Sequence, residues 1–281
     1  MPVKLVLCDT DGTVLPFGQK HVSRRTREAM RALVAAGITC GMATGREPWD
    51  VDEVFEGDPI GTRTGDFANG KLVKLEGEVV LRRTLDKASL ARLARFAYTQ
   101  PDCGLVMQGD PTPGEPHGHR VLLGATPEEA ERMRTSEGGH VGVQLVDRLP
   151  EGDVVNAGFL CPDDPVRVRR LRAMLAQEVP DLAFVSPAPG FFDVLPAGCD
   201  KGTGFLELVR HMGIERDEVV FFGDSENDLA LMCLVPNSVC VANGTLQARE
   251  AARWHIGPVY QDAVAEAMEQ IAATGELPFE R

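Results

Sequence analysis

Two aspartates near the N-terminus, Asp9 and Asp11, stand two positions apart directly after an apolar run at residues 3–7. Side chains with this spacing on an extended segment point the same way, so both carboxylates are expected on one side of a strand end. Two anions there repel each other unless a cation or a proton lies between them. One would then suit a nucleophile or metal ligand, and the other a general acid. The alternative is an ordinary polar Asp-Thr-Asp-Gly turn after a strand.

Three further polar clusters have comparable positions. Residues 38–43 form an apolar run that leads into Thr44-Gly45-Arg46, and residues 219–222 lead into Gly223-Asp224-Ser225-Glu226-Asn227-Asp228. Asp200-Lys201-Gly202-Thr203 opens a predicted helix. Ligands of open α/β sheets bind outside the carboxyl ends of parallel strands. The four clusters are therefore expected to meet in one crevice.

The elements that must position these clusters follow from apolar periodicity and from helix start and stop residues. Ser23 is an expected N-cap, and Pro48 suits the first turn of a helix. Helices are expected at 23–36, from 48, at 86–99, from 126, and at 164–179, 201–211, 227–234, 245–252 and 262–273. Strands are expected at 3–7, 38–43, 71–75, 79–81, 104–108, 121–123, 143–146, 154–160, 182–186, 191–195, 219–222 and 238–241. The alternation before residue 84 predicts an α/β class fold with a doubly wound parallel sheet.

Together and in this order, the clusters resemble the four motifs of the haloacid dehalogenase-like hydrolase superfamily. The first motif matches Asp9-Thr10-Asp11-Gly12-Thr13, the second Thr44, the third Lys201, and the fourth residues 223–228. The resemblance implies a Rossmann-like core. Taken singly, Thr44 fits a plain turn, Lys201 a solvated lysine, and residues 224–228 a helix N-cap cluster.

The resemblance also implies a role for each residue. Asp9 would attack phosphorus, and Asp11 would protonate the leaving group and then activate water. The implied catalytic residues are Asp9, Asp11, Thr44 and Lys201. The implied Mg²⁺ site comprises Asp9, the backbone carbonyl of Asp11, Asp224 and, in support, Asp228. The implied substrate contacts are Thr44, Gly45, Arg46, Asn69, Lys201 and Asn227, although Asn69-Gly70 equally fits an ordinary turn.

Residues 84–189 carry strands and helices with no polar cluster at a strand end, which predicts an inserted α+β module. In the family an insertion between the second and third motifs is a cap. Its size and element order resemble the C2B subtype of subfamily IIB, with Cof-like and sucrose-phosphatase-like members. The catalytic core is then expected at 1–83 and 190–281. His117 and His119 could form a metal site with His140, but their Pro/Gly-rich loop at 109–118 favours an exposed cap loop over a zinc site.

The amino-acid composition limits the partners and the cellular compartment that we expect. The formal net charge is −13, from 29 basic and 42 acidic residues, which argues against a nucleic-acid partner. No apolar run reaches the roughly 18 residues of a membrane helix, and no signal peptide is expected. The seven cysteines form no close pair and predict buried, reduced thiols in a cytoplasmic protein. We expect a monomer or homodimer.

Asp11 reduces the number of reaction classes that the resemblance allows. Family dehalogenases lack an acid at this position and the transport ATPases carry Thr, so Asp11 implies a phosphatase or phosphomutase. Mutases of this cap class space the fourth motif differently, which favours an Mg²⁺-dependent phosphatase acting on a small phosphorylated metabolite, foremost a sugar phosphate. A sugar-phosphate phosphomutase and a non-catalytic metabolite-binding protein stay open as alternatives. Ala242-Asn243-Gly244 departs from the Met-x-Asn-Ala of the Cof-like branch, which leaves the branch open.

Overall fold

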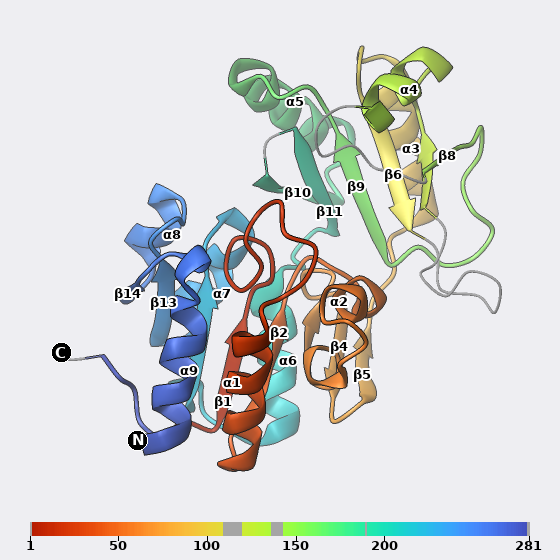
Figure 1. Cartoon of the computed structure of the whole chain (residues 1–281). Coiled ribbons are helices and arrows are strands. Elements are labelled where there is room, and N and C mark those ends of the chain that lie inside the picture. The colour runs from red at the N-terminus through yellow and green to blue at the C-terminus, as the bar shows by residue number, and fades with distance from the viewer. Residues whose placement is uncertain (1, 109–119, 136–142, 189, 280–281) are drawn as a thin grey trace. The chain divides into compact units, whose positions relative to one another are not determined.

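The computed structural model describes residues 2–108, 120–135, 143–188 and 190–279 of the chain (Figure 1). The chain divides into two compact units. The core unit comprises Met1–Arg82 and Asp200–Arg281, and the inserted unit comprises Arg83–Cys199. His117, His119 and His140 lie outside the described residues. None of the helices in the described ranges combines the length and apolar character needed to cross a bilayer.

The core unit is built on an eight-stranded sheet with the order β14-β13-β12-β1-β2-β3-β4-β5. The strands are β1 (Leu5–Cys8), β2 (Thr39–Ala43), β3 (Gly65–Phe67), β4 (Leu72–Leu75), β5 (Glu78–Arg82), β12 (Val219–Gly223), β13 (Asn237–Val241) and β14 (Trp254–Ile256). Every pairing from β14 to β3 is parallel, whereas β4 and β5 form an antiparallel edge. The strand order reverses at β1, which lies between β12 and β2.

Helices cover both faces of this sheet (Figure 1). Val6 and Cys8 of β1 pack in one buried cluster with α1 (Arg24–Ala35), α2 (Pro48–Val54) and α9 (Ala263–Thr274). Leu5 and Leu7 point to the other face, toward α6 (Lys201–Met212), α7 (Leu229–Leu234) and α8 (Leu246–Ala251). Because β1 is apolar on both sides, it lies in the centre of the sheet. The predicted doubly wound α/β core is confirmed.

Helix starts in the core unit follow the predicted caps. The Ser23 side chain accepts a hydrogen bond from the backbone nitrogen of Thr26 at the start of α1. At α6, Asp200 accepts from the backbone nitrogen of Thr203, and the Thr203 hydroxyl accepts from the backbone nitrogen of Asp200. Such caps are typically worth about 1 kcal/mol each. The second cap fixes Lys201 in the first turn of α6.

In its described residues, the inserted unit has a six-stranded sheet, with the order β10-β11-β9-β6-β7-β8, and three helices. Its strands are β6 (Gly104–Gln108), β7 (Arg120–Leu123), β8 (Gln144–Leu145), β9 (Asn156–Leu160), β10 (Leu182–Ala188) and β11 (Phe191–Pro196). Its helices are α3 (Lys87–Tyr98), α4 (Pro127–Thr135) and α5 (Pro165–Glu178). Leu93 of α3 and Leu175 of α5 share a buried cluster with Phe159 of β9. The unit is α+β, as expected for the insertion.

The C-terminal boundary of the inserted unit differs from the expectation. We expected the core to resume at residue 190, but the inserted unit continues to Cys199. The reason is strand pairing: β11 forms antiparallel ladders with both β10 and β9. An apolar alternation identifies a strand but does not name its neighbours. The three-residue strands β3 and β14 were also not expected, because they are too short to show a period.

Candidate active site

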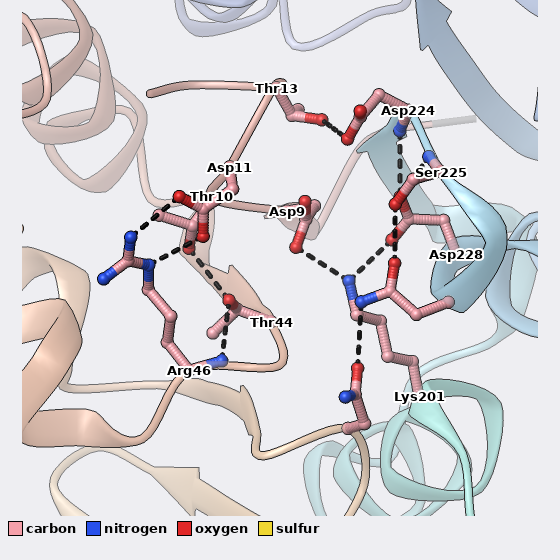
Figure 2. Close-up of polar contacts among 12 residues, drawn as sticks. Asp9, Thr10, Asp11, Thr13, Thr44, Arg46, Lys201, Asp224, Ser225 and Asp228 are labelled. Atoms are coloured by element: carbon pink, nitrogen blue, oxygen red, sulfur yellow. Dashed lines mark hydrogen bonds and ion pairs between the residues drawn. The ribbon is translucent and has the colours of Figure 1, made fainter. Parts of the chain in front are cut away.

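The predicted site residues of the core unit lie where several parallel strands end (Figure 2). Asp9 follows β1, Thr44 follows β2, and Asp224 follows β12. The strand order reverses at β1, and crevices at such points are the usual ligand sites of doubly wound sheets. Lys201, in the first turn of α6, extends its side chain toward Asp9 at the end of β1.

Lys201 bridges two carboxylates. Its Nζ donates to Asp9 Oδ1 and to Asp228 Oδ1, both at 2.7 Å. The three side chains are 0 %, 6 % and 0 % exposed in the order Lys201, Asp9 and Asp228. Burial alone would lower the pKa of Lys201, but the adjacent charges of Asp228 and Asp9 outweigh it and raise that pKa. Lys201 is therefore a fixed positive charge beside Asp9.

Asp228 also shapes the loop that follows β12. Its Oδ2 accepts hydrogen bonds from the backbone nitrogens of Asp224, at 2.8 Å, and Ser225, at 3.0 Å. A Cβ at Gly223 would lie 2.7 Å from Asp228 Cγ, so only glycine fits at the end of β12. Both Asp228 oxygens are thus engaged, one with Lys201 and the other with the loop that carries Asp224.

Three carboxylates converge at this point. Asp9, Asp224 and Asp228 each offer an oxygen, and these atoms lie within 4.8 Å of one another. Burial raises the pKa of Asp9, and burial followed by the charge of Asp228 raises the pKa of Asp224 to about 7. Lys201 balances only part of this negative charge. A buried set of hard oxygen donors with excess negative charge fits a divalent cation such as Mg²⁺.

Thr13 of the first motif bonds Asp224, and Asn243 bonds the backbone of the same motif. Thr13 Oγ1 donates to Asp224 Oδ1 at 3.0 Å. Asn243 Nδ2 donates to the carbonyl oxygen of Gly12 at 2.7 Å. Gly12 has a φ of +79°, and a Cβ there would lie 2.5 Å from Asp224 Oδ2. The Gly-Thr pair after Asp11 therefore lets the β1 and β12 loops meet.

Asp11 has a different partner from Asp9. Arg46 donates two hydrogen bonds to the Asp11 carboxylate, from Nε to Oδ2 at 2.7 Å and from Nη2 to Oδ1 at 2.8 Å. The Arg46 and Asp11 side chains are 30 % and 40 % exposed. The two aspartates share one site, but only Asp9 belongs to the carboxylate cluster. The Asp11 side chain is engaged by Arg46 and lies outside the cluster of Asp9, Asp224 and Asp228.

Thr44 is held by its backbone and by its side chain. Its nitrogen donates to the carbonyl of Asp66, and its carbonyl accepts from the nitrogen of Asn69. Its Oγ1 lies 3.0 Å from Thr10 Oγ1 and accepts from the Arg46 nitrogen at 3.2 Å. Gly45 lies between Thr44 and Arg46, where the backbone bends.

Asn69 and Asn227 contact each other. Asn227 Nδ2 donates to Asn69 Oδ1 at 3.1 Å, and Ser225 Oγ donates to Asn227 Oδ1 at 2.8 Å. Asn69 has a φ of +53° and Gly70 a φ of +87°. A Cβ at Gly70 would lie 2.0 Å from the Asp200 carbonyl oxygen, so this turn packs against the start of α6. The Asn-Gly signal thus marks a turn that also lines the Lys201 site.

Three residues that position the site were not singled out from the sequence: Thr10, Thr13 and Asn243. Thr10 and Thr13 stand inside the first motif, where a hydroxyl beside two carboxylates is a usable signal. Asn243 stands in a loop whose departure from a family pattern was noticed, but its bond to Gly12 depends on the loop conformation.

The chain resembles known proteins over nearly its whole length. Residues 6–268 match the family model described as haloacid dehalogenase-like hydrolase. The chain is 27 % identical over 289 residues to an HMP-PP phosphatase of Klebsiella pneumoniae, covering 98 % of each chain. It is 22 % identical over 284 residues to the 5-amino-6-(5-phospho-D-ribitylamino)uracil phosphatase YbjI of Escherichia coli, covering 100 % of each chain.

The fold is shared with a solved sugar phosphatase described as HAD subclass IIB. The TM-score is 0.78 at 19 % identity, over 96 % of this chain and 99 % of that chain. The expected subfamily IIB fold, with its inserted cap, is confirmed, and so is the expected enzyme class, a hydrolase of the phosphatase type. Because one family model spans nearly the whole sequence, the chain belongs to the haloacid dehalogenase-like hydrolase family.

Proposed function

We propose that this hydrolase is an Mg²⁺-dependent phosphatase that cleaves a small phosphorylated metabolite through an aspartyl-phosphate on Asp9. The observation that carries the proposal is the buried bridge from Lys201 to Asp9 and Asp228 beside Asp224. A nucleophile, a fixed cation and a metal-binding set of carboxylates are the parts that phosphoryl transfer needs.

Asp9 is the proposed nucleophile. A carboxylate oxygen forms a bond to phosphorus while the bond from phosphorus to the ester oxygen breaks, which leaves an aspartyl-phosphate. Lys201, at 2.7 Å from Asp9 Oδ1, holds the carboxylate in one orientation and places a positive charge beside the transferred group. Asp9, Asp224 and the Asp11 carbonyl would hold Mg²⁺, with Asp228 in support. When bound, the ion would neutralise negative charge on the carboxylates and the phosphoryl oxygens.

Asp11 is the proposed proton shuttle. Protonated, it would give its proton to the departing alkoxide, and the resulting carboxylate would then take a proton from the water that attacks the aspartyl-phosphate. Its partial exposure and its Arg46 partner keep it apart from the buried carboxylates. This separation allows the two aspartates to have opposite roles.

The phosphoryl group would be bound by residues around these two aspartates. Thr44 and Lys201 offer a hydroxyl and an ammonium group, and Asn69 and Asn227 are joined to each other by a side-chain hydrogen bond. Arg46 uses Nε and Nη2 on Asp11, so its remaining nitrogen, Nη1, can face a substrate oxygen. The proposed substrate contacts are Thr44, Gly45, Arg46, Asn69, Lys201 and Asn227.

A sugar phosphate is the substrate class that we propose to test first. It is supported by the solved structure of a sugar phosphatase with the same fold. The two relatives by sequence are named for other substrates, HMP-PP and 5-amino-6-(5-phospho-D-ribitylamino)uracil. A panel of sugar phosphates together with the two substrates in these names therefore suits this chain.

Release of inorganic phosphate from such a panel, with and without Mg²⁺, tests the proposal. We expect Mg²⁺-dependent release that disappears in Asp9→Asn, because the amide is a poor nucleophile. Asp52→Asn, on an exposed position of α2, is the matched control and should behave as the wild type. Metal-independent release, or release that survives in Asp9→Asn, contradicts the mechanism. Isomerisation of a hexose phosphate without phosphate release would instead identify a mutase.

We further propose that the protein works in the cytoplasm as a monomer or homodimer. All seven cysteines are free, and six of them are buried: Cys8, Cys40, Cys103, Cys161, Cys199 and Cys240. Unpaired thiols are typical of reducing compartments. Light scattering of the purified protein measures the oligomeric state.

A further inference from the structure

Thr10, between the two aspartates of the first motif, has a buried hydroxyl group. The residue is 0 % exposed, and its Oγ1 lies 3.0 Å from Thr44 Oγ1 (Figure 2). Across the described ranges, Thr44 is the only hydrogen-bond partner of the Thr10 hydroxyl. A buried hydroxyl with a single partner is expected to make that bond persistently, because the unpaired group would be costly.

The hydrogen bonds of Thr44 limit how this pair can be arranged. A hydroxyl has one proton and two acceptor lone pairs. The backbone N–H of Arg46 can only donate, and it occupies one lone pair of Thr44 Oγ1 at 3.2 Å. The contact with Thr10 either fills the second lone pair or uses the only proton of Thr44.

These two arrangements differ in what they leave for a substrate. If Thr44 donated to Thr10, it would have no proton for a phosphoryl oxygen. If Thr10 donates, both lone pairs of Thr44 are filled and the Thr44 proton is directed to a third partner. We infer that Thr10 is a positioning residue, which donates to Thr44 and thereby directs the Thr44 proton to the phosphoryl group. This inference rests on the proposed phosphatase function.

The scaffold keeps the two hydroxyls together. The Thr10 carbonyl accepts from the backbone nitrogens of Val14, at 3.0 Å, and Leu15, at 2.8 Å. Thr44 is fixed by backbone bonds at its nitrogen and its carbonyl, each to the segment that contains β3 and the following turn. Both backbones are thus anchored independently of the hydroxyl contact. Removing the Thr10 hydroxyl should therefore change the direction of one proton more than the position of Thr44.

Thr10→Val is the decisive variant, since valine keeps the shape and the branching at Cβ. With p-nitrophenyl phosphate as the probe, we expect kcat to fall about three- to tenfold, the range of one neutral hydrogen bond. KM should change less than about twofold, because the directed proton acts mainly on the transition state. Thr10→Ser keeps a hydroxyl and should restore most of the loss. Equal kcat in wild type and Thr10→Val overturns the inference.

A double-mutant cycle separates positioning from a structural role. If Thr10 acts through Thr44, then Thr10→Val should have no further effect on kcat in a Thr44→Val background. If Thr10 only stabilises the fold, both backgrounds should lose the same factor, and Thr10→Ser should not restore kcat. Thermal unfolding of each variant shows how much of any loss comes from unfolded protein. A fully additive cycle overturns the inference.

Asp9→Asn separates this inference from the function on which it rests. Wild-type turnover that is abolished by Asp9→Asn supports the phosphatase, and the Thr10 variants then decide the inference alone. If the wild type shows no turnover that depends on Asp9, the proposed function fails and the inference fails with it. If turnover depends on Asp9 and all Thr10 variants match the wild type, only the inference about Thr10 fails.

Discussion

The site has two halves, and in each a basic side chain pairs with an aspartate of the first motif. The pair of one half is buried, and the pair of the other is partly exposed. On the β12 side, Lys201 joins Asp9 and Asp228 in a cluster whose side chains are at most 6 % exposed. On the β2 side, Arg46 joins Asp11, and these side chains are 30 % and 40 % exposed. Both halves place a cation against an aspartate of the same motif. They differ in access to water and in the number of partners.

This difference suits two different tasks. A nucleophile and a metal need charges that stay in place, and a dry, fully bonded cluster provides that. A proton shuttle must exchange protons with a leaving group and with water, which calls for access to solvent. Buried ion pairs are also costly to break, whereas exposed pairs contribute little to stability. Substitutions in the two halves should therefore separate stability from activity.

Lys201→Met should have the largest effect. It leaves Asp9 and Asp228 without their shared cation, and breaking a buried pair in this way costs about 3–5 kcal/mol of unfolding free energy. Phosphatase activity should fall about 10³-fold with the loss of the charge beside the phosphoryl group. Urea unfolding without metal and steady-state kinetics measure both. An unfolding free energy within about 1 kcal/mol of wild type would mean that the ion pairs of Lys201 contribute no more to stability than exposed pairs do.

Asp11→Asn should separate activity from stability. We expect kcat to fall by about 10²-fold or more, because the shuttle is lost. The unfolding free energy should change by less than about 1 kcal/mol, because the pair with Arg46 is partly exposed and is screened by water. The loss should be larger for an alkyl phosphate than for p-nitrophenyl phosphate, whose leaving group needs less help from an acid. Equal losses on both substrates would argue against the shuttle role.

Asp224→Asn should act on the metal. The variant keeps the size of the side chain and its contact with Thr13 but removes one negative charge from the cluster. We expect the Mg²⁺ concentration for half-maximal activity to rise at least about tenfold. The thermal stabilisation that Mg²⁺ gives should also shrink, since at a fixed ligand concentration the stabilisation rises with the logarithm of the affinity. Asp52→Asn serves again as the control. An unchanged Mg²⁺ titration would remove Asp224 from the metal site.

The sequence was informative about the site because each motif follows an apolar strand, and parallel strands end at one edge of a sheet. Asp9, Thr44 and Asp224 therefore came together as expected. The division of Asp9 and Asp11 between Lys201 and Arg46 was not predictable. It depends on where the chain turns after β1, and β1 already ends at Cys8, before either aspartate.

Strand partners and side-chain rotamers could not be predicted from the sequence. The alternation of β11 was recognised, but its ladders with β9 and β10 place it in the inserted unit, and nothing local in residues 191–196 selects these partners. The contact between Thr10 and Thr44 joins residues 34 positions apart and depends on two side-chain torsions. Such contacts follow from the fold and cannot be read before it is known.

Arg46→Met should have the smallest effect of the four and tests the exposed half directly. The variant removes both hydrogen bonds to Asp11 but leaves that carboxylate in contact with water, which can replace them. We expect the unfolding free energy to fall by about 0.2–1 kcal/mol, against the much larger loss in Lys201→Met. KM for the substrate should rise severalfold, since the proposed contact of Nη1 with the phosphoryl group is lost. Denaturant unfolding and kinetics, with Lys201→Met measured in parallel, make the comparison. Equal destabilisation by the two variants would mean that solvent access does not distinguish the two halves of the site.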